Sequence, residues 1–487
     1  MSAAARSMDW KDLLAGLARP AQSVSLSDLC LDSRQCAPGS VFVAMTGEQG
    51  HGLDHLSQAL AAGAVGVIHD GRRSLPPCPV PMVEVPELAA QLPLLARRFF
   101  GAPDDMDLVA VTGTNGKTSV AWLLAQALDA AMLGTLGLGR PGAERPGTHT
   151  TPDLLSVYRA LAALREEGCY RVVLEASSHA LAQDRLSGLA FSSVIFTGLG
   201  HDHLDYHADI AAYFEAKARL FTAYRSARQI INLDDSHGRE LADRIGAGPT
   251  LLGYSLNDQP GAVACLKAQR LDLSGVEACI SLAEAELRLK SALIGRINLH
   301  NLAIVALELH ARGLGPAEIG ARVRALEPVP GRMQVIADGE AVARAVVDYA
   351  HTPDALEQAL TSLRELGADQ IWCVFGCGGE RDRAKRPMMG RVAESLADRV
   401  ILTDDNPRSE DGTAIIRDIQ SGMRHPERSR VIRDRADAIR IALTECHLGD
   451  LVLIAGKGHE TVQWTGGSSH PHSDLAVARQ ALEAVVS

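Results

Sequence analysis

Short apolar runs alternate with stretches of helical periodicity along most of the chain. Strand-like runs at 108–111, 171–177 and 193–199 are separated by segments whose apolar residues recur at helical spacing. Alternation of this kind predicts a parallel sheet covered by helices. Residues 250–290 alternate more loosely, and we expect antiparallel strands there. The pattern as a whole predicts an α/β fold.

The pattern is interrupted twice, and each interruption predicts a domain boundary. Residues 1–88 mix short β-like runs with one helical pattern, and an amphipathic helix over 86–100 is expected to act as a connector. Two prolines and a glycine break the pattern again at 327–336. After this break, four apolar strands each end in a polar turn before a helix, as in a Rossmann-like domain. We predict three α/β domains, with a mostly parallel sheet in the central one: 1–88, 89–332 and 333–487.

Composition is that of an ordinary globular protein and excludes several classes. Of the 487 residues, 46% are hydrophobic and 22% charged, and the net charge of −11 argues against nucleic acid or anionic membrane as a partner. The N-terminus lacks an apolar signal core, and no run approaches the roughly 18 apolar residues of a membrane span. Nine scattered cysteines without a C-x-x-C pair are typical of reduced thiols. We therefore expect a cytoplasmic protein.

A glycine-rich loop between a predicted strand and a predicted helix carries the strongest chemical signal. Residues 113–118 read Gly-Thr-Asn-Gly-Lys-Thr, so backbone N–H groups and a helix N-terminus can face an anion. Lys117 would contact the β- and γ-phosphates, and Thr118 would hold Mg²⁺. Val111 replaces the first glycine of the strict P-loop motif, so a helix-capping turn is the alternative. Strand, loop and helix together favour nucleotide binding.

Other candidate residues are ambiguous by themselves. Glu175 ends a predicted strand, where an acidic residue often serves Mg²⁺, although it could also cap the next helix. Residues 201–207 are rich in His and Asp; most are typical of turns, and one is a candidate metal ligand. Lys217 looks like a helical lysine that reaches solvent. Glycines followed by basic residues at 376–386 form an anion site in outline. The residues alone predict an ATP- and Mg²⁺-using enzyme, without choosing between a kinase, a ligase and an ATP-driven switch.

The motifs, taken in order, resemble those of the Mur ligases of bacterial cell-wall synthesis, over nearly the whole chain. They include TGTNGKT at 112–118, EASSHAL at 175–181, DYAHTPDAL at 348–356, DDNPR at 404–408 and GKGHE at 456–460. Each motif alone is weak, but the ordered series is specific. The resemblance implies three domains that hold a UDP-sugar, ATP and an incoming amino acid in turn, so that 1–88 would bind uridine, 89–332 ATP and Mg²⁺, and 333–487 the amino acid.

Within this family, the resemblance is strongest to the branch that adds meso-diaminopimelate. That branch implies an ATP-dependent amide ligase acting on the D-Glu γ-carboxylate of UDP-MurNAc-L-Ala-D-Glu through an acyl phosphate. It also implies ATP as co-substrate and two Mg²⁺ ions, and we expect a monomer. The alternatives are a lysine-adding or folylpolyglutamate synthase-like ligase of the same fold, and a P-loop ATPase or kinase switch.

The resemblance assigns roles to individual residues. Lys217 would carry a carbamate, which arginine cannot form, and lysine makes up only 7 of the 48 basic residues. The catalytic and metal-binding set is Lys117, Thr118, Glu175, His203 and Lys217. The ATP set is Gly113, Thr114, Asn115, Gly116, Lys117, Thr118, Ser119, Asn301 and Arg332, with Asp348 as a further candidate. The UDP-sugar-peptide set is Leu31, Ser33, Glu48, Gln49, Gly50, His149, Thr150, Thr151, Ser177, Gln183 and Arg185. The diaminopimelate set is Arg381, Asp405, Asn406, Pro407, Arg408, Gly456 and Glu460.

Overall fold

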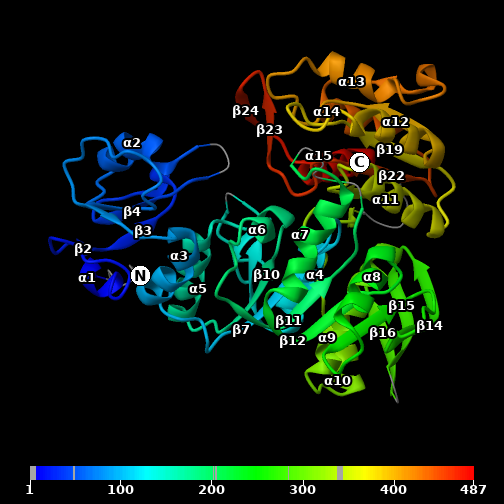
Figure 1. Ribbon diagram of the computed structural model, residues 1–487. Helices are drawn as coiled ribbons and strands as arrows, with labels where there is room; N and C mark the ends of the chain where they lie inside the picture. The colour runs from blue at the N-terminus through cyan, green and yellow to red at the C-terminus, as the bar shows by residue number, and fades with distance from the viewer. Residues whose placement is uncertain are drawn as a thin grey trace. The chain divides into compact units, whose positions relative to one another are not determined.

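The structure is a computed structural model, in which helices and strands alternate along the chain (Figure 1). It describes residues 7–47, 50–147, 149–200, 202, 206–282, 285–336 and 344–486. Contacts divide the chain into two compact units. One contains the residues up to Val111 with Asp129–Val194 and Ala216–Ala227, and the other contains Thr112–Leu128, Ile195–Glu215 and the residues from Arg228 onward. Each candidate pocket described below lies within one unit.

The N-terminal residues form a four-stranded parallel sheet. Its order is β3-β4-β5-β6, and its strands are β3 (Asp28–Cys30), β4 (Ser40–Ala44), β5 (Gly66–His69) and β6 (Met82–Glu84). Helix α2 (Leu56–Ala61) buries Leu56 and Ala59 in a cluster with Phe42 and Val67 of the sheet. The short elements β1 (Met8–Asp9), α1 (Trp10–Leu13) and β2 (Ser25–Leu26) precede the sheet, and the predicted connector is helix α3 (Leu88–Phe100).

A ten-stranded sheet follows, in the order β16-β15-β14-β13-β12-β11-β7-β10-β8-β9. Its strands are β7 (Asp107–Thr112), β8 (Ala131–Gly134), β9 (Gly137–Gly139), β10 (Arg171–Glu175), β11 (Ala190–Phe196), β12 (Arg225–Asn232), β13 (Leu251–Ser255), β14 (Ala264–Asp272), β15 (Gly275–Leu282) and β16 (Ala285–Ser291). β14, β15 and β16 pair antiparallel, as predicted for 250–290. The prediction is wrong for β13, which runs parallel to β12 and to β14. Helix α8 (Ser236–Ile245) lies between β12 and β13 and returns the chain to the other end of the sheet, so that the two strands can pair in parallel.

The helices of this region begin where side chains satisfy free backbone N–H groups. Asp153, Ser177 and Asp235 accept hydrogen bonds from the first turns of α5, α6 and α8, as N-cap residues do. The helices are α4 (Lys117–Ala127), α5 (Leu154–Glu166), α6 (Ser178–Ala182), α7 (Ile210–Thr222), α8 (Ser236–Ile245), α9 (Arg296–Ala311) and α10 (Pro316–Arg324).

The C-terminal sheet has six strands in the order β17-β18-β22-β19-β20-β21. They are β17 (Gln334–Ile336), β18 (Arg344–Asp348), β19 (Ile371–Phe375), β20 (Arg399–Leu402), β21 (Arg430–Val431) and β22 (Leu451–Ala455). All pairs except β17–β18 are parallel, so the four predicted polar turns follow strands that end at one edge. A hairpin, β23 (Val462–Thr465) and β24 (Ser468–Pro471), follows β22.

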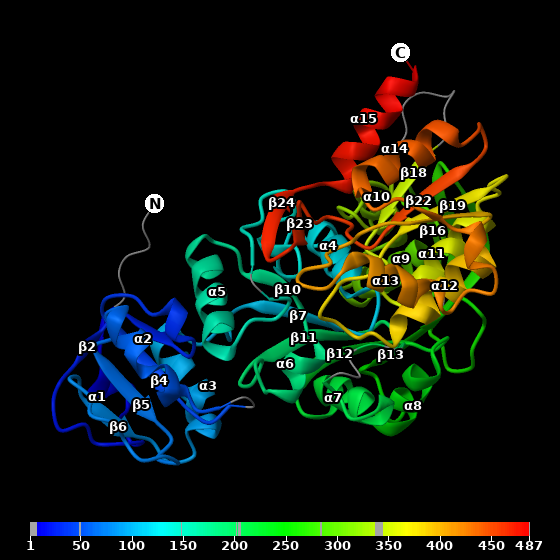
Figure 2. The same ribbon diagram turned by 90° about the horizontal axis from the view of Figure 1, so that it is seen from above.

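Helices cover both faces of the C-terminal sheet. Leu360, Met389 and Ile415 belong to one buried cluster, whereas Ile439 and Leu482 belong to a second. Figure 2 shows α14 and α15 lying beside each other, and residues of both helices belong to the second cluster. This is the doubly wound arrangement that the sequence predicts. The helices are α11 (Pro353–Glu365), α12 (Lys385–Leu396), α13 (Gly412–Gln420), α14 (Arg435–Glu445) and α15 (Asp474–Val486).

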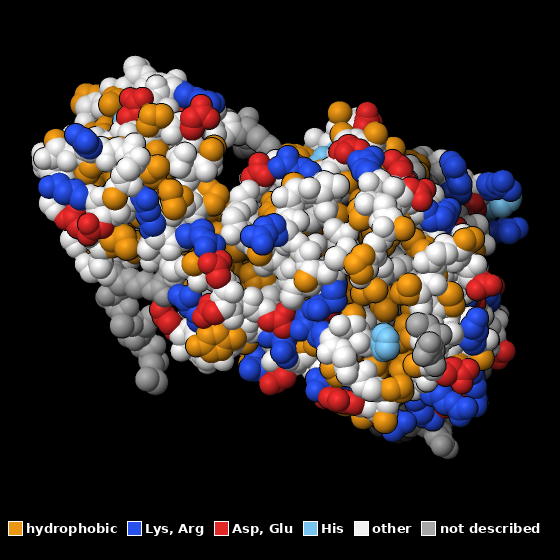
Figure 3. Space-filling model, turned by 60° about the horizontal axis from the view of Figure 1, so that its bottom comes forward, with side chains coloured by type: hydrophobic (Ala, Val, Ile, Leu, Met, Phe, Trp, Pro, Cys, Tyr) orange, Lys and Arg blue, Asp and Glu red, His pale blue; other side chains and the backbone are white. Residues whose placement is uncertain are grey.

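Across the described residues, every helix is too short or too polar to cross a membrane. Figure 3 shows Lys and Arg side chains interspersed with Asp and Glu over the face in view.

Candidate active site

The phosphate loop joins β7 to α4, as the sequence predicts. Gly113 and Gly116 have φ of 148° and 83°, conformations that favour glycine. A side chain on Gly113 would collide with Thr197 Oγ1, so the loop also needs glycine for close packing. Lys117 Nζ donates to the carbonyl oxygens of Gly113 and Thr114, each at 2.8 Å. The ammonium group therefore lies across the loop that a phosphate would enter.

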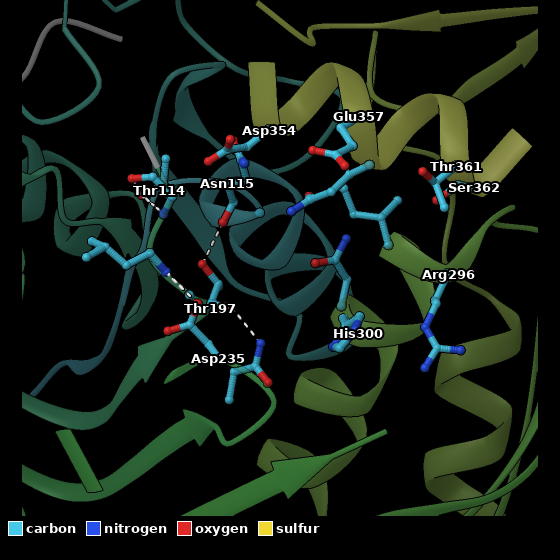
Figure 4. Close-up of a pocket in the computed structure, with 18 of the residues that line it drawn as sticks. Thr114, Asn115, Thr197, Asp235, Arg296, His300, Asp354, Glu357, Thr361 and Ser362 are labelled. Carbon is cyan, nitrogen blue, oxygen red and sulfur yellow. Dashed lines mark hydrogen bonds between the residues drawn. The ribbon is translucent and has the colours of Figure 1, made fainter. Parts of the chain in front are cut away.

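The segment after β11 holds the loop in place. Thr197 Oγ1 donates to the carbonyl oxygen of Asn115 at 2.6 Å, and Asn232 Nδ2 donates to the Thr197 carbonyl oxygen at 3.0 Å. Asp235 accepts a hydrogen bond from Leu199 N at 3.0 Å (Figure 4). Neither Thr197 nor Asp235 was predicted from the sequence. Only their positions in the sequence could have indicated them, because Thr197 directly follows a strand and Asp235 caps a helix.

The loop forms one wall of a cavity of about 500 Å³, which is within the range of small-molecule pockets. Figure 4 shows α9 and α11 supplying other walls. Burial lowers the pKa of His300 to about 4, so its imidazole is neutral at pH 7. The Oδ1 of Asn301, a predicted ATP contact, lies 3.4 Å from where a Gly116 Cβ would be. Further lining residues that the sequence analysis missed are Arg296, Asp354, Glu357, Thr361 and Ser362.

Arg332, another predicted ATP contact, also lies beside the loop. Its Nη2 donates to Thr118 Oγ1 at 3.4 Å, and its guanidinium carbon is 4.4 Å from the ring centroid of Tyr349. Within the described structure, its buried Nε has no hydrogen-bond partner, which leaves a donor for a ligand. Asp348 accepts a hydrogen bond from Met333 N at 2.7 Å, and burial raises the pKa of this carboxyl group.

Two predicted metal ligands are deeply buried, and a third lies outside the described residues. Glu175 is fully buried and accepts hydrogen bonds from Thr135 N at 2.7 Å and Thr135 Oγ1 at 3.3 Å. Lys217 on α7 is 1% exposed, which contradicts the view of it as a lysine that reaches solvent. His203 is the residue outside the described ranges. Within those ranges, no three His, Cys, Asp or Glu side chains gather as a metal site.

Residues predicted to hold the muramoyl peptide form a hydrogen-bonded group. Thr151 Oγ1 donates to the Glu175 carbonyl oxygen at 2.6 Å and accepts from Ser177 N at 3.1 Å. Arg185 donates to the Thr151 carbonyl oxygen at 2.7 Å and to Gln183 Oε1 at 2.9 Å. Thr150 is linked through Thr135, whose hydroxyl lies 3.0 Å from its own.

A second cavity, of about 510 Å³, is lined by four residues of the predicted UDP-sugar-peptide set. Leu31, Ser33, His149 and Arg185 line it, whereas Glu48 and Gln49 lie outside the described residues. The carbonyl of Gly50 accepts a hydrogen bond from Gly47 N, at 2.8 Å. Lining residues that the sequence analysis missed are Asp32, Arg34, Gln35, Phe42, His55, Gln58 and Asp153.

The predicted diaminopimelate arginines flank one glycine at the edge of the C-terminal sheet. A Cβ on Gly378 would lie 3.3 Å from Arg408 Nη1 and 3.7 Å from Arg381 Cγ. Arg408 donates its backbone N–H to the Trp464 carbonyl oxygen at 2.9 Å, so the hairpin β23–β24 steadies this turn. The carbonyl oxygen of Pro407 lies so close to Gly379 that no side chain fits there.

The DDNPR and GKGHE turns are joined by buried polar contacts. Lys457, which is fully buried, donates to Asn406 Oδ1 at 2.9 Å and to Glu460 Oε2 at 2.8 Å. Asn406 Nδ2 also donates to Glu460 Oε2, at 2.8 Å. Burial raises the pKa of Asp405, whose Oδ2 lies 2.5 Å from where a Gly456 Cβ would be. The structure thus brings the predicted residues of both turns together.

Glu410 connects the DNPR turn to basic residues just before and at the start of α12, and we expect it to make stability pH-dependent. It accepts hydrogen bonds from Arg386 Nη2 at 3.0 Å and from Arg383 Nη2 at 2.8 Å. The hydrogen bond from Arg386 is the main reason that the pKa of Glu410 falls to about 2. A folded-state pKa below the unfolded value means that this stabilisation is complete above about pH 4.5 and is lost as pH falls toward 2.

Glu410→Gln should therefore lower stability by about 2 kcal/mol at pH 6, as loss of a charge-assisted hydrogen bond does. The difference from the unchanged protein should shrink as pH falls toward 2. Guanidinium unfolding midpoints of both proteins across this range would measure it. A constant difference at all pH values would show that Glu410 stabilises by packing alone.

Three family models match consecutive parts of the chain. Residues 26–100 match the Mur ligase family catalytic domain, 111–308 the Mur ligase middle domain, and 331–458 the Mur ligase glutamate ligase domain. A protein of Xanthomonas campestris pv. campestris (strain 8004) is 45% identical over 484 residues, which cover 98% of each chain. A protein of Pseudomonas aeruginosa (strain PAO1) is 44% identical over 467 residues, which cover 94% of this chain and 95% of that protein.

The chain belongs to the Mur ligase family. Both relatives are named UDP-N-acetylmuramoyl-L-alanyl-D-glutamate–2,6-diaminopimelate ligase. A solved structure of a ligase with that name has a TM-score of 0.69 and 35% identity, and the match covers 98% of this chain and 99% of the other. The resemblance seen in the sequence and the predicted α/β fold are confirmed.

Proposed function

We propose that this protein is an ATP-dependent amide ligase that joins meso-diaminopimelate to the D-Glu γ-carboxylate of UDP-MurNAc-L-Ala-D-Glu. The proposal of diaminopimelate as the amino acid rests on one observation, the pair Arg381 and Arg408 beside Gly378. Diaminopimelate differs from lysine by one carboxylate, and a guanidinium group binds a carboxylate through two parallel hydrogen bonds. The names of the two relatives support the same reaction.

In this proposal, ATP occupies the 500 Å³ cavity, with its phosphates against the loop. Backbone N–H groups of Gly113–Lys117 and the Lys117 ammonium group offset the negative charge that a carboxylate meets as it approaches a polyphosphate. Arg332 supplies a second cation beside Thr118, and Asn301 lies beside Gly116 of the loop. The neutral His300 ring and Arg296 line the end of this cavity away from Thr114, where the nucleobase of ATP would lie (Figure 4).

The reaction then has two steps. The D-Glu γ-carboxylate attacks the γ-phosphorus, a C–O–P linkage forms, and ADP leaves. The amine of diaminopimelate attacks the acyl carbon, loses a proton and expels phosphate, so that an amide results. The intermediate is hydrolysed easily, and the chain must position both substrates and keep water away.

The hydroxyl of Thr118 and the carboxylate of Glu175 are oxygen donors of the kind that Mg²⁺ prefers. We propose Thr118, Glu175, His203 and Lys217, the last as a carbamate, as the residues that hold it. When bound, Mg²⁺ would neutralise charge on the phosphates. The 510 Å³ cavity would hold the UDP-sugar, and the group around Thr151 and Arg185 its peptide. Since ATP and a nucleotide sugar are the substrates, we propose that the protein acts in the cytoplasm. The expectation of a monomer remains a separate proposal.

Arg408→Ala should lower kcat/KM for diaminopimelate at least about tenfold, because a charge-assisted hydrogen-bonded pair contributes roughly 1.5–3 kcal/mol. The KM for ATP should change little. Phosphate release with UDP-MurNAc-L-Ala-D-Glu and either diaminopimelate or lysine measures both values. Arg430→Ala is the matched control, since Arg430 pairs with Glu445 on the surface of the same sheet. Unchanged preference for diaminopimelate in Arg408→Ala would contradict the assignment.

The same assay separates the alternatives. Preference for lysine in the unchanged protein would indicate a lysine-adding ligase, and turnover without a UDP-sugar would indicate a folylpolyglutamate synthase-like enzyme. ATP hydrolysis that needs neither an acceptor nor an amine would indicate an ATPase switch.

A further inference from the structure

Two cysteines enclose the loop that lines the candidate UDP-sugar cavity. Cys30 ends β3, and Cys36 follows the short 3₁₀ helix Ser33–Gln35. Their Sγ atoms lie 2.6 Å apart, and the side chains are 1% and 9% exposed. All five residues between them, 31–35, line the cavity. A bond between these two sulfurs would therefore close a ring around one wall of the cavity.

We propose that Cys30 and Cys36 form an oxidative modification site, a reversible disulfide that fixes the 31–35 loop in its cavity-lining conformation. The oxidant is a hydroperoxide. The Cys36 thiolate attacks the O–O bond, which gives a sulfenic acid and, with hydrogen peroxide, one water. The Cys30 sulfur then attacks the Cys36 sulfur, an S–S bond forms, and a second water leaves. Two thiols lose two protons and two electrons, and the peroxide gains them.

The environment assigns different roles to the two sulfurs. The pKa of Cys36 is lowered because its sulfur accepts a hydrogen bond from the Cys30 thiol, whereas that same bond and burial raise the pKa of Cys30. A cysteine with a lowered pKa is the usual first target of peroxide, and Cys36 is also the more exposed of the two. Cys36 is therefore the attacking residue, and Cys30, held beside it, is the resolving residue.

The disulfide should form with little movement of the cavity wall. The present separation of 2.6 Å exceeds the usual S–S bond length of about 2.05 Å by about half an ångström. The loop is already tied down, because Ser33 Oγ donates to Gln58 Oε1 at 2.8 Å and Asp32 accepts from Arg34 N at 2.9 Å. The bond would thus restrict the loop without displacing Leu31 or Ser33. We expect amide exchange across 31–36 to slow at least about fivefold, since local opening is restricted.

Peptide mapping of the full chain tests the modification directly. Arg34 is the tryptic site between the two cysteines, so the peptides 12–34 and 35–72 carry one cysteine each. After treatment with hydrogen peroxide and alkylation, we expect these peptides as a linked pair whose mass is lower by two hydrogens than their sum. Dithiothreitol should separate them. Cys36→Ser and Cys30→Ser should lack the pair, whereas Cys78→Ser, a cysteine packed against the same core, should retain it.

Absence of the linked pair in the unchanged protein would overturn the proposal. A linked pair without slower amide exchange at 31–36 would overturn the part that concerns the loop. The link to substrate binding rests on the proposed function, and calorimetry with UDP tests it: the oxidised protein should bind UDP at least as tightly as the reduced one. Failure of both forms to bind UDP would count against the proposed function. The peptide masses and the amide exchange rates would still test the disulfide independently.

Discussion

Lys117→Ala is expected to reduce turnover at least about 10³-fold, as loss of a cation that offsets transferring phosphoryl charge does. The ammonium group donates to two carbonyl oxygens of its own loop, at 2.8 Å each. An incoming phosphate can replace these carbonyls as the partner without any change elsewhere in the fold. Phosphate release under saturating substrates measures the effect, and thermal unfolding should be nearly unchanged because the side chain is only half-buried.

Lys290→Arg and Lys290→Ala are suitable controls for this experiment. Lys290 pairs with Glu277 on the surface of the β15–β16 ladder, and its side chain is 64% exposed. Both variants should keep full turnover. If Lys117→Ala also kept it, the loop would not be the site of phosphoryl transfer, and the assignment of the 500 Å³ cavity to ATP would fail with it.

Lys217→Arg should be nearly inactive, with turnover reduced at least about a hundredfold, although it preserves the positive charge. A buried ammonium group is costly unless it is compensated, and Lys217 is only 1% exposed. Reaction of its Nζ with carbon dioxide releases a proton and creates an anionic oxygen ligand, whereas a guanidinium group cannot undergo this reaction under the same conditions. Loss of a residue that only supports a metal ligand typically costs about 10- to 100-fold, and loss of a ligand itself should cost at least the upper end of that range.

Two measurements distinguish a carbamate from a structural lysine. Protein prepared with ¹³C-labelled bicarbonate should show one carbamate carbon signal, which Lys217→Arg lacks and Lys290→Arg retains. The binding of ATP should persist in Lys217→Arg, because the proposed ATP contacts are other residues. Full activity of Lys217→Arg would contradict carbamate chemistry at this position.

The fold was largely predictable because each predicted strand ends in a turn with a distinct chemical composition. The runs that precede Asp348, Gly376 and Asp404 are continuous and apolar, as strands buried on both faces are. The direction of β13 was not predictable in the same way. Its pairing depends on where α8 returns the chain, and a run of five residues carries no signal for that.

The candidate site was predictable where chemistry and position coincide in one motif, and elsewhere it was not. Lys117 and Arg408 lie in short motifs whose residue types already indicate their ligands. Thr197 and Phe42 reach their cavities through the packing of distant elements, which periodicity does not encode. The burial of Lys217 was equally hidden, because alanines on both sides of it, at 216 and 218, give no contrast between a solvent face and a core face.

The backbone at Arg408 restricts how the choice of amino acid can be redesigned. Its φ is 55°, a conformation that costs most residues with a side chain about 1–2 kcal/mol. Glycine and asparagine adopt this conformation most readily. A library that seeks a different amine substrate should therefore sample Gly and Asn at this position first and avoid Val, Ile and Thr. If a β-branched residue at this position abolished activity, the cause would be a distorted turn and not a changed preference for the amine substrate.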